Sequence, residues 1–482
     1  MRKWILGWVI VMVVLTLLRL YPHRTDILVY GSSPGAVAAA IGAARVGGDV
    51  LLISPIPWVG GVMTAGGLSV LDGETGTGIA LEFQDRVQIH YGSGADIKSQ
   101  ISSCTYEPKV GEAILRQMLR EAEVKVQTGW ELSAVRTKGR RITGATFRKG
   151  LRRRTYESKM VVDASWNGDL AAMAGCDFYL GQDPPERFGE LLPGHSIPGR
   201  EQCISQPVII QRYDTPRPVP RPAGYDPTLY ARPNLRWLKP RNQPYSVRWY
   251  GRLPDPKLVM LNYPAQQNLP VNYCAASPEE QDQMVRRAKD RTLGFVYYLQ
   301  NETNMGTHWA IADDQFPTSD GFPMEPYTRE SRRIICRHMV TERDIVPAEE
   351  LALATERPGE LIIASPKHRA PKPPDSIAFA DYNIRDVHVP NRDFPRLKQP
   401  FPRRWGIPYG ALVPVQFDNL LMGDSNIGSS HIARGSFRLQ PSRMRIGQAA
   451  GVAAVVALHG GTWPSNVKRI QALLKRQGCE PI

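Results

Sequence analysis

The stretch from Asp26 to Asp72 constrains the fold of this chain more than any other part of the sequence. Ile27–Tyr30 is a short apolar run of strand formers, and Gly31–Gly35 is a turn of small residues. Ala36–Val46 is rich in alanine and predicts a helix, and Val50–Ile53 predicts a second buried strand. The stretch therefore predicts a parallel strand–helix–strand unit, the building block of an open α/β sheet.

The turn of this unit carries most of a nucleotide-binding fingerprint. A strand–helix–strand unit leaves free backbone N–H groups at the start of its helix, and together with the helix dipole they favour a pyrophosphate. The usual pattern there is GxGxxG, and this chain has Gly31, Ser33 and Ala36 at the three positions. The hydroxyl of Ser33 must therefore be accommodated beside the phosphate or must donate to it. The alternative is an ordinary buried unit without a ligand.

A second glycine-rich loop follows the second strand and carries a family resemblance. Residues 60–68, GGVMTAGGL, and the turn at 30–36, YGSSPGA, resemble the corresponding pieces of the FAD-dependent oxidoreductase family, which has the glutathione-reductase-like flavoprotein fold. The resemblance implies an α/β fold with a Rossmann-like FAD-binding domain, built from a parallel sheet and a β-meander. It implies noncovalent FAD, contacted by the turn and by Gly60 and Gly61. The chain departs from the family at Ser54, where relatives carry a glutamate that binds the adenosine ribose.

The β-meander of that fold is predicted directly after the first part of the domain. Glu131–Thr137, Arg141–Phe147 and Arg154–Val162 read as three antiparallel strands separated by Lys-Gly turns. Asp163 follows the last of them in a phrase that the family also carries, and the resemblance places it at the cofactor.

The remaining chain divides into an insertion and a return to the same domain. We expect residues 25–182 and 322–482 to form the FAD-binding domain. Residues 183–321 are dense in proline, with arginine and tyrosine interleaved, and predict an inserted substrate or cap region. The alternative is a proline-rich surface segment that only packs against the domain.

Near the C-terminus, an apolar strand ends on Gly423 and Asp424. In relatives, a late Gly-Asp pair lies near the ribityl chain and pyrophosphate, so the resemblance implies that both residues contact FAD. The next helix contains Gly447, Gln448 and Gly451, and the resemblance implies that its small residues let the backbone approach the flavin. The alternative is a tightly packed alanine-rich helix.

Four residues are candidates for the chemistry of the substrate. His431 and Arg434 follow the Gly-Asp strand, and Arg329 and Arg332 lie in a phrase that the family also carries. Imidazole titrates near neutral pH, so His431 is the candidate acid or base, whereas the arginines are candidates for holding an anionic substrate or the charge of a reduced flavin. The alternatives are a structural histidine and a salt-bridged basic helix around Arg329. Relatives carry histidine at the position of Arg434, which leaves the proton-transfer group open.

Residues 1–20 predict a segment outside the fold. Arg2 and Lys3 precede an uncharged run over residues 4–18, whose length as a helix is roughly 22 Å, shorter than a bilayer core of about 30 Å. Because no small-residue cleavage site follows, we expect an uncleaved N-terminal membrane anchor, with an exported protein and a cleaved signal as the alternative.

Charge and cysteine content exclude little on their own. The net charge of +14 is compatible with nucleic acid, an anionic surface or an acidic ligand, but no nucleic-acid motif accompanies it, and we expect no nucleic-acid partner. The six cysteines are scattered without a CxxC pair, so we expect no metal centre.

Together these features predict an FAD-dependent oxidoreductase. It is expected to transfer a hydride or electrons between a small-molecule substrate and an unknown electron acceptor. Two alternatives remain: a non-catalytic FAD-binding protein on a degenerate flavoprotein fold, suggested by Ser33 and Ser54, and a flavin-dependent RNA-modifying enzyme, suggested only by the charge.

Overall fold

The computed structural model describes residues 22–481 apart from 99–101, 185, 191–197, 231–250, 263–271, 348, 350–354, 358–359, 363–369, 383–395, 399–403 and 464. The predicted membrane segment at residues 1–20 lies outside the described residues. Within the described part, none of the helices combines the length and the apolar character needed to cross a bilayer.

The core of the molecule is a parallel sheet with the strand order β5-β2-β1-β8-β19. Its strands are β1 (His23–Tyr30), β2 (Val50–Ser54), β5 (Lys125–Thr128), β8 (Arg152–Asp163) and β19 (Leu420–Met422). The second half of β1 and the whole of β2 and β19 are buried, as expected for strands that are covered on both faces. The predicted α/β fold is therefore confirmed. The late strand returns beside β8 and not directly beside β1.

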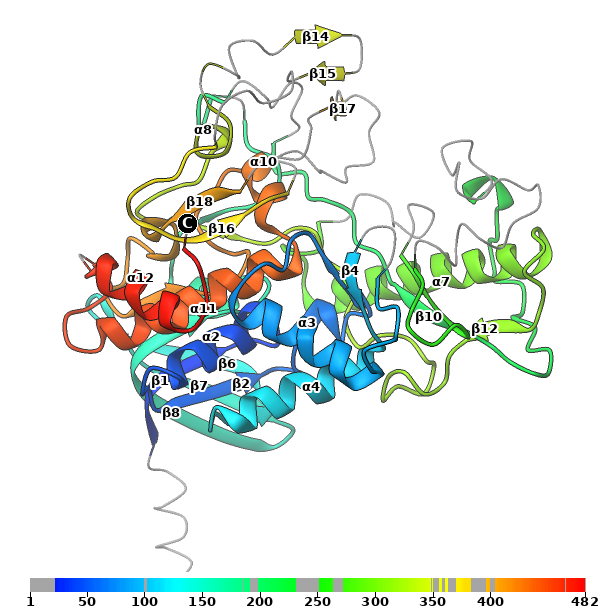
Figure 1. Cartoon of the computed structure of the whole chain (residues 1–482), viewed down its shortest axis with the longest axis horizontal. Helices are drawn as coiled ribbons and strands as arrows, with labels where there is room; N and C mark the ends of the chain where they lie inside the picture. The colour runs from blue at the N-terminus through cyan, green and yellow to red at the C-terminus, as the bar shows by residue number, and fades with distance from the viewer. Residues whose placement is uncertain are drawn as a thin grey trace, which may run out of the picture.

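Helices cover one face of this sheet. Figure 1 shows α2 (Pro34–Ala44) and α11 (Gln440–Ala457) side by side, with α3 (Gly78–Tyr91) and α4 (Pro108–Glu121) next to them. Both α2 and α11 consist largely of alanine and glycine, and almost all of their residues are buried. Small side chains allow the two helix backbones to approach closely, which places the start of α2 next to the end of β19.

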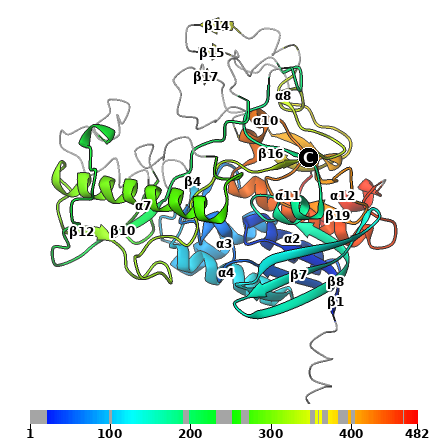
Figure 2. The same cartoon turned by 180° about the vertical axis from the view of Figure 1, so that it is seen from behind.

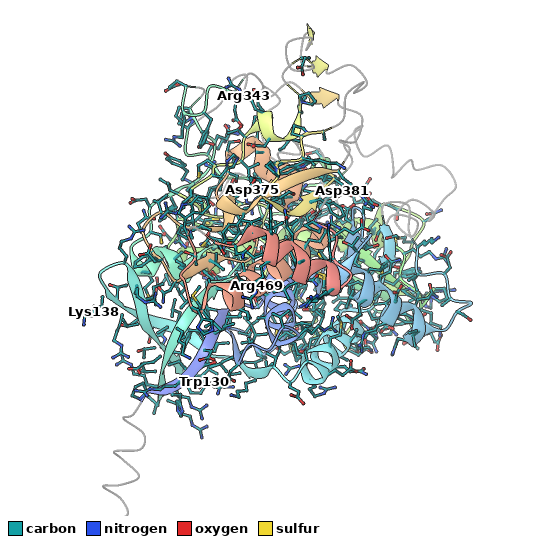
Figure 3. All side chains as sticks on the ribbon, turned by 60° about the vertical axis from the view of Figure 1, so that its left-hand side comes forward. Trp130, Lys138, Arg343, Asp375, Asp381 and Arg469 are labelled. Carbon is teal, nitrogen blue, oxygen red and sulfur yellow. The ribbon has the colours of Figure 1, made fainter. Side chains whose placement is uncertain are left out.

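The predicted meander covers the other face. It consists of β6 (Glu131–Lys138), β7 (Arg141–Lys149) and the first part of β8, and the ring of Phe147 on β7 lies 5.6 Å from that of Tyr30 on β1. Figure 2 shows the meander from behind, and Figure 3 labels Lys138, the last residue of β6. The third predicted strand was only partly correct, because β8 is antiparallel to β7 up to Tyr156 and parallel to β1 from that residue onward.

The described part of the inserted region has a small core of its own. Strands β10 (Val208–Arg212), β11 (Leu258–Leu261) and β12 (Trp309–Ile311) form a sheet, and α7 (Pro278–Asn301) packs on it. The predicted capping box at the start of α7 is confirmed: Glu280 N donates to Ser277 Oγ at 3.3 Å, and Ser277 N donates to Glu280 Oε2 at 2.8 Å. Figure 1 shows α7 to one side of the parallel sheet.

The other described elements are short connections and small sheets. They are η1 (Gly61–Met63), β3 (Val70–Asp72), β4 (Ser102–Thr105), α5 (Asp169–Ala174), β9 (Phe178–Tyr179), η2 (Pro227–Leu229), β13 (Arg333–Ile334), α8 (Glu342–Ile345), β14 (Thr355–Arg357), β15 (Glu360–Ile362), β16 (Ser376–Ala380), β17 (Arg396–Lys398), β18 (Trp405–Pro408), η5 (Tyr409–Leu412), α10 (His431–Arg434), η6 (Gly435–Phe437) and α12 (Val467–Arg476).

Candidate functional site

A cavity opens at the start of α2, outside the carboxyl end of β1. This is the edge of an open α/β sheet at which ligands bind. The lining comes from the turn after β1, the glycine-rich loop, the segment after β8, the inserted region and α11 (Ser32, Ser33, Gly61, Val62, Trp166, Tyr273, Asp282, Val285, Met324, Glu325, Pro326, Thr328 and Arg443). Two of the predicted FAD contacts, Ser33 and Gly61, thus line one cavity.

The hydroxyl of Ser33 caps α2. Its Oγ accepts a hydrogen bond from Ala36 N at 3.1 Å and donates to the carbonyl oxygen of Ala164 at 2.7 Å. The turn that presents it depends on Gly31, whose φ is 138° and where an added Cβ would lie 2.2 Å from Ala164 O. Serine therefore takes the place of the fingerprint glycine by forming an N-cap.

The late Gly-Asp pair lies directly against this turn. Asp424 Oδ2 accepts a hydrogen bond from Gly35 N at 3.2 Å, and its Oδ1 lies 2.6 Å from Arg443 Nε in a buried ion pair. An added Cβ on Gly35 would lie 2.1 Å from the carbonyl oxygen of Gly423. The two distant segments therefore meet as predicted. The expectation that the first N–H groups of α2 are free is wrong for Gly35 and Ala36, since Asp424 and Ser33 bind them.

A carboxyl group also faces the larger cavity. Burial raises the pKa of Glu325 to about 7, with Asp169 acting in the same direction and the nearby Arg443 opposing them. Glu325 is therefore neutral in a large fraction of molecules at neutral pH. A phosphate at the start of α2 would favour that neutral form.

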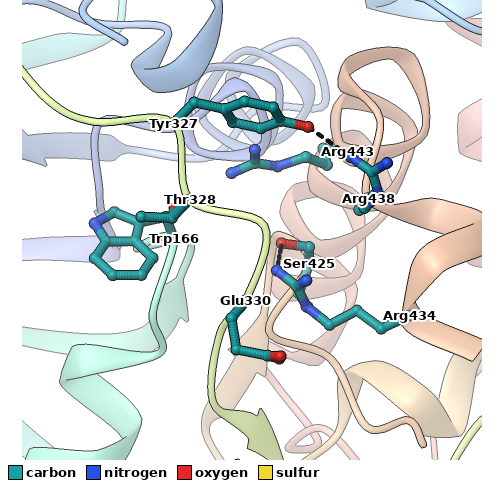
Figure 4. A pocket seen from close by; sticks show the side chains of 8 residues that line it. All are labelled: Trp166, Tyr327, Thr328, Glu330, Ser425, Arg434, Arg438 and Arg443. Carbon is teal, nitrogen blue, oxygen red and sulfur yellow. Dashed lines mark hydrogen bonds between the residues drawn. The ribbon is translucent and has the colours of Figure 1, made fainter. Parts of the chain in front are cut away.

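A second, smaller cavity adjoins the first and is lined almost entirely by polar side chains. Figure 4 shows its lining: Trp166, Tyr327, Thr328, Glu330, Ser425, Arg434, Arg438 and Arg443. Trp166, Thr328 and Arg443 line both cavities. We call the first the larger cavity and the second the arginine cavity.

The predicted histidine binds a carboxylate at the edge of the arginine cavity. His431 Nε2 lies 2.9 Å from Glu330 Oε2, and both side chains are almost fully buried. Burial by itself raises the pKa of Glu330, but the attraction and hydrogen bond of His431, followed by Arg434, lower it to about 2. Glu330 is thus a carboxylate at neutral pH. Glu330 lines the cavity, whereas His431 does not.

Arg434 is a buried cation held by neutral oxygens. Nε donates to Ser425 O at 3.3 Å, Nη2 donates to Ser425 Oγ at 3.2 Å, and Nη1 donates to Arg329 O. Burial lowers the pKa of Arg434 to about 10, and Glu330 opposes this effect. The guanidinium therefore stays charged at neutral pH and faces the arginine cavity.

The other two predicted catalytic arginines lie outside both cavities. The segment around Arg329 belongs to neither a helix nor a strand: Glu330 lines the arginine cavity, whereas Arg329 donates to Ser205 Oγ at 3.2 Å. Arg332 forms an ion pair with Asp169 at 2.7 Å. The alternative of a salt-bridged basic helix here is wrong, because the backbone is not helical.

Several predicted FAD contacts are engaged in local structure. Ser54 Oγ lies 2.9 Å from the carbonyl oxygens of both Ile56 and Trp58, so its hydroxyl fixes the loop after β2. The carboxylate of Asp163 accepts hydrogen bonds from Ser165 and from Ala171 N, which ties β8 to α5. Neither residue lines the two cavities.

The glycines of α11 face α2. An added Cβ on Gly447 would lie 2.1 Å from Gly35 O, and one on Gly451 would lie 2.0 Å from Ala39 O. Gln448 accepts a hydrogen bond from Ile79 N at 3.1 Å. The expectation that these small residues face the flavin is corrected: they allow two helices to pack. Gly60 likewise packs away from the cavities, since its Cβ would lie 2.5 Å from Leu115 Cδ1.

Sequence reasoning missed Trp166, Glu325, Arg438 and Arg443, and considered Glu330 only as an ion-pair partner of arginines. Arg443 lies in the first turn of α11, just before the alanine-rich part of that helix. A usable signal was present, because an arginine at a buried helix start close to a Gly-Asp strand needs a carboxylate partner.

The fold and the site define a class of protein. A parallel sheet with a β-meander, an N-capped turn and a late Gly-Asp pair at its edge define a nucleotide-binding flavoprotein fold. The sequence profile of the family described as FAD dependent oxidoreductase matches residues 26–476, and the chain belongs to this family. It is an FAD-dependent oxidoreductase by family.

Comparisons with individual proteins are weaker than the family match. CabE, an aromatic hydroxylase from angucycline biosynthesis, is 10% identical with a TM-score of 0.35, and the match covers 65% of this chain and 54% of CabE. THI4 of Thermovibrio ammonificans is 16% identical with a TM-score of 0.26, covering 40% of this chain and 82% of THI4. The p-nitrophenol 4-monooxygenase PnpA of Pseudomonas putida DLL-E4 is 10% identical with a TM-score of 0.33, covering 66% and 70%. No curated protein sequence matches the chain significantly.

The residues that line the larger cavity suit the cofactor of the family. The guanidinium of Arg443 lies at the start of α2, which suits a pyrophosphate, and the cavity adds the aromatic ring of Trp166. The glycine loop closes against the turn so tightly that a Cβ on Gly61 would lie 2.9 Å from Ser33 Cα. Contact of these individual residues with FAD stays a prediction.

Proposed function

We propose that this oxidoreductase holds FAD in the larger cavity and acts on a small molecule that enters the arginine cavity. The observation that carries the proposal is the shared wall: Trp166, Thr328 and Arg443 line both spaces. A molecule in the arginine cavity is therefore next to whatever occupies the larger one. Such proximity is what transfer between a cofactor and a substrate requires.

The residues that would hold FAD are those at the start of α2 and the side chains opposite it. Ser33 and Gly61 shape the wall, and Arg443 offers the positive charge that a pyrophosphate needs. Bound FAD supplies the exchange of a hydride or of electrons, and the protein supplies position and charge.

On the substrate side, Glu330 and His431 act together. Glu330 offers a carboxylate oxygen to the arginine cavity, where it accepts a hydrogen bond from a substrate hydroxyl or amine. Its low pKa makes it a weak proton acceptor, and the bond from His431 fixes its orientation. We assign His431 a positioning role through Glu330.

The inserted region contributes to the wall of the larger cavity. Tyr273, Asp282 and Val285 belong to residues 183–321 and line the larger cavity. This supports the proposal that the insertion is a substrate or cap region of a domain built from residues 25–182 and 322–482.

Spectroscopy of the purified full chain tests the function. We expect flavin absorbance, release of FAD on heating, and reoxidation of the photoreduced protein by a quinone or dye. A protein that binds FAD but is not reoxidised by any acceptor would be the non-catalytic alternative. A colourless protein that does not take up FAD would exclude both.

We further propose that residues 1–20 attach the protein to a membrane. The support is the sequence alone, an uncharged run over residues 4–18 next to Arg2 and Lys3. Alkaline carbonate extraction of cell membranes tests it: an anchored protein stays in the pellet, and a protein with a cleaved signal is found in the soluble fraction without these residues.

A further inference from the structure

We propose that the substrate carries a carboxylate, and that Arg434 binds this group in the arginine cavity. The proposal rests on the proposed function, since it names the class of substrate for the same site. The charges and the unused hydrogen-bond donors of the cavity wall support it.

Arg434 has unused hydrogen-bond donors at the arginine cavity. Only 2% of this residue is exposed, and its three hydrogen bonds go to two oxygens of Ser425 and to the carbonyl oxygen of Arg329. A guanidinium has five N–H groups, so two of them have no acceptor among the described residues. Glu330, which pairs with His431, offsets the buried charge of Arg434 only in part. A bound anion would offset it further.

Arg443 adds positive charge at the boundary of the arginine cavity. Its Nε binds Asp424 at 2.6 Å, and its two terminal nitrogens have no acceptor among the described residues. Figure 4 shows its guanidinium extending from α11 toward Thr328, and Arg443 lines both cavities. Its terminal nitrogens are therefore placed for the proposed pyrophosphate, and its charge also favours an anion in the arginine cavity.

The carboxylates near the cavity are already engaged. Glu330 pairs with His431, and Asp424 binds Arg443 and Gly35 N. A third arginine, Arg438, lines the same wall and donates to the hydroxyl of Tyr327 at 2.5 Å. Three of the eight side chains that line the space are arginines and one is a carboxylate, which favours an anionic group over a cationic one.

The chemistry of the wall favours a carboxylate. Arg434 lines the arginine cavity with two N–H groups that have no acceptor among the described residues. Guanidinium groups bind planar carboxylates through two parallel hydrogen bonds, a geometry that a neutral amide cannot reproduce.

The test uses the full-length holoenzyme and small probes. The visible spectrum of bound FAD is titrated with acetate and benzoate, with acetamide and benzamide as uncharged matches and with inorganic phosphate. We expect the acids to perturb the spectrum at least about 10-fold more tightly than their amides. Tighter binding of phosphate, equal binding of acids and amides, or no response to either acid would overturn the proposal.

Variants locate the binding group. Arg434→Gln is expected to weaken acid binding about 10- to 100-fold without changing amide binding, and Arg438→Gln is used if the first variant does not load FAD. The matched control is Arg140→Gln, a surface arginine paired with Asp418, which is expected to bind the acids as the wild type does. Loss of FAD in both cavity variants would show that the anion is the cofactor's own phosphate and would refute the inference. A wild type without FAD would instead refute the proposed function.

Discussion

Gly451→Ala tests the contact that joins the two halves of the site. Alanine normally stabilises a helix by about 1 kcal/mol relative to glycine. Here the added Cβ would lie 2.0 Å from the backbone oxygen of Ala39, against an ordinary contact distance of 3.4 Å. Because that oxygen belongs to α2 and cannot rotate away, the helices must separate by about 1.4 Å.

The sign of the effect is therefore reversed. Overpacking of a well-packed core costs about 3 kcal/mol at the upper end of its usual range, so the net destabilisation is about 2 kcal/mol after the gain in helix propensity. A chain of 482 residues has an unfolding entropy of about 1 kcal/mol/K. If it unfolds cooperatively, the Tm falls by about 2 °C.

Equilibrium urea unfolding and a thermal melt measure this change. The matched control is Gly460→Ala, just after α11, where nothing lies within 4 Å of the added Cβ. Its free energy of unfolding should differ from that of the wild type by less than about 0.5 kcal/mol. A Gly451→Ala protein as stable as the wild type, or more stable, would refute the close packing of α11 on α2.

Three further changes test the site. Ser33→Ala removes the N-cap of α2 and should lower stability by about 1 kcal/mol in urea unfolding, whereas Ser33→Thr should keep most of it. Above pH 7 the wild-type apoprotein should bind FAD more weakly, because the pKa of Glu325 is about 7 and its charged form repels a phosphate. Glu325→Gln should remove this pH dependence, and equal pH profiles of FAD affinity for wild type and variant would contradict it. Glu330→Gln should destabilise the protein by about 3 kcal/mol at pH 7. The folded pKa of about 2 lies below the unfolded value of about 4.3, so this stability exists above pH 4.3 and is lost as the pH falls toward 2. A difference in unfolding free energy between wild type and variant that stays the same as the pH falls through this range would contradict the role of the Glu330 carboxylate.

Local patterns predicted the framework well because they depend on neighbours in sequence. The strand at Ile27–Tyr30, the turn at Gly31 and the capping box at Ser277 each follow from short-range steric and hydrogen-bonding rules. The meeting of Gly35 with Asp424 followed from the family resemblance, since 389 positions separate them.

The roles of single residues were harder to predict because they depend on distant partners. A glycine that admits another helix and a glycine that admits a cofactor look the same in sequence, and Gly451 is of the first kind. Arg332 and Arg434 are equally basic, but Asp169 neutralises Arg332 and no ion pair neutralises Arg434 among the described residues. The sequence pattern around Arg332 and Arg434 could not distinguish the two arginines, because the carboxylate that pairs with Arg332 lies on another segment of the chain.

A crystal structure of the protein loaded with FAD shows whether the cofactor lies where we propose. We predict the pyrophosphate at the start of α2 beside Ser33 and Arg443, with the flavin ring near the shared wall at Trp166 and Thr328. FAD bound elsewhere, or a cavity at the start of α2 that stays filled by side chains, would contradict it.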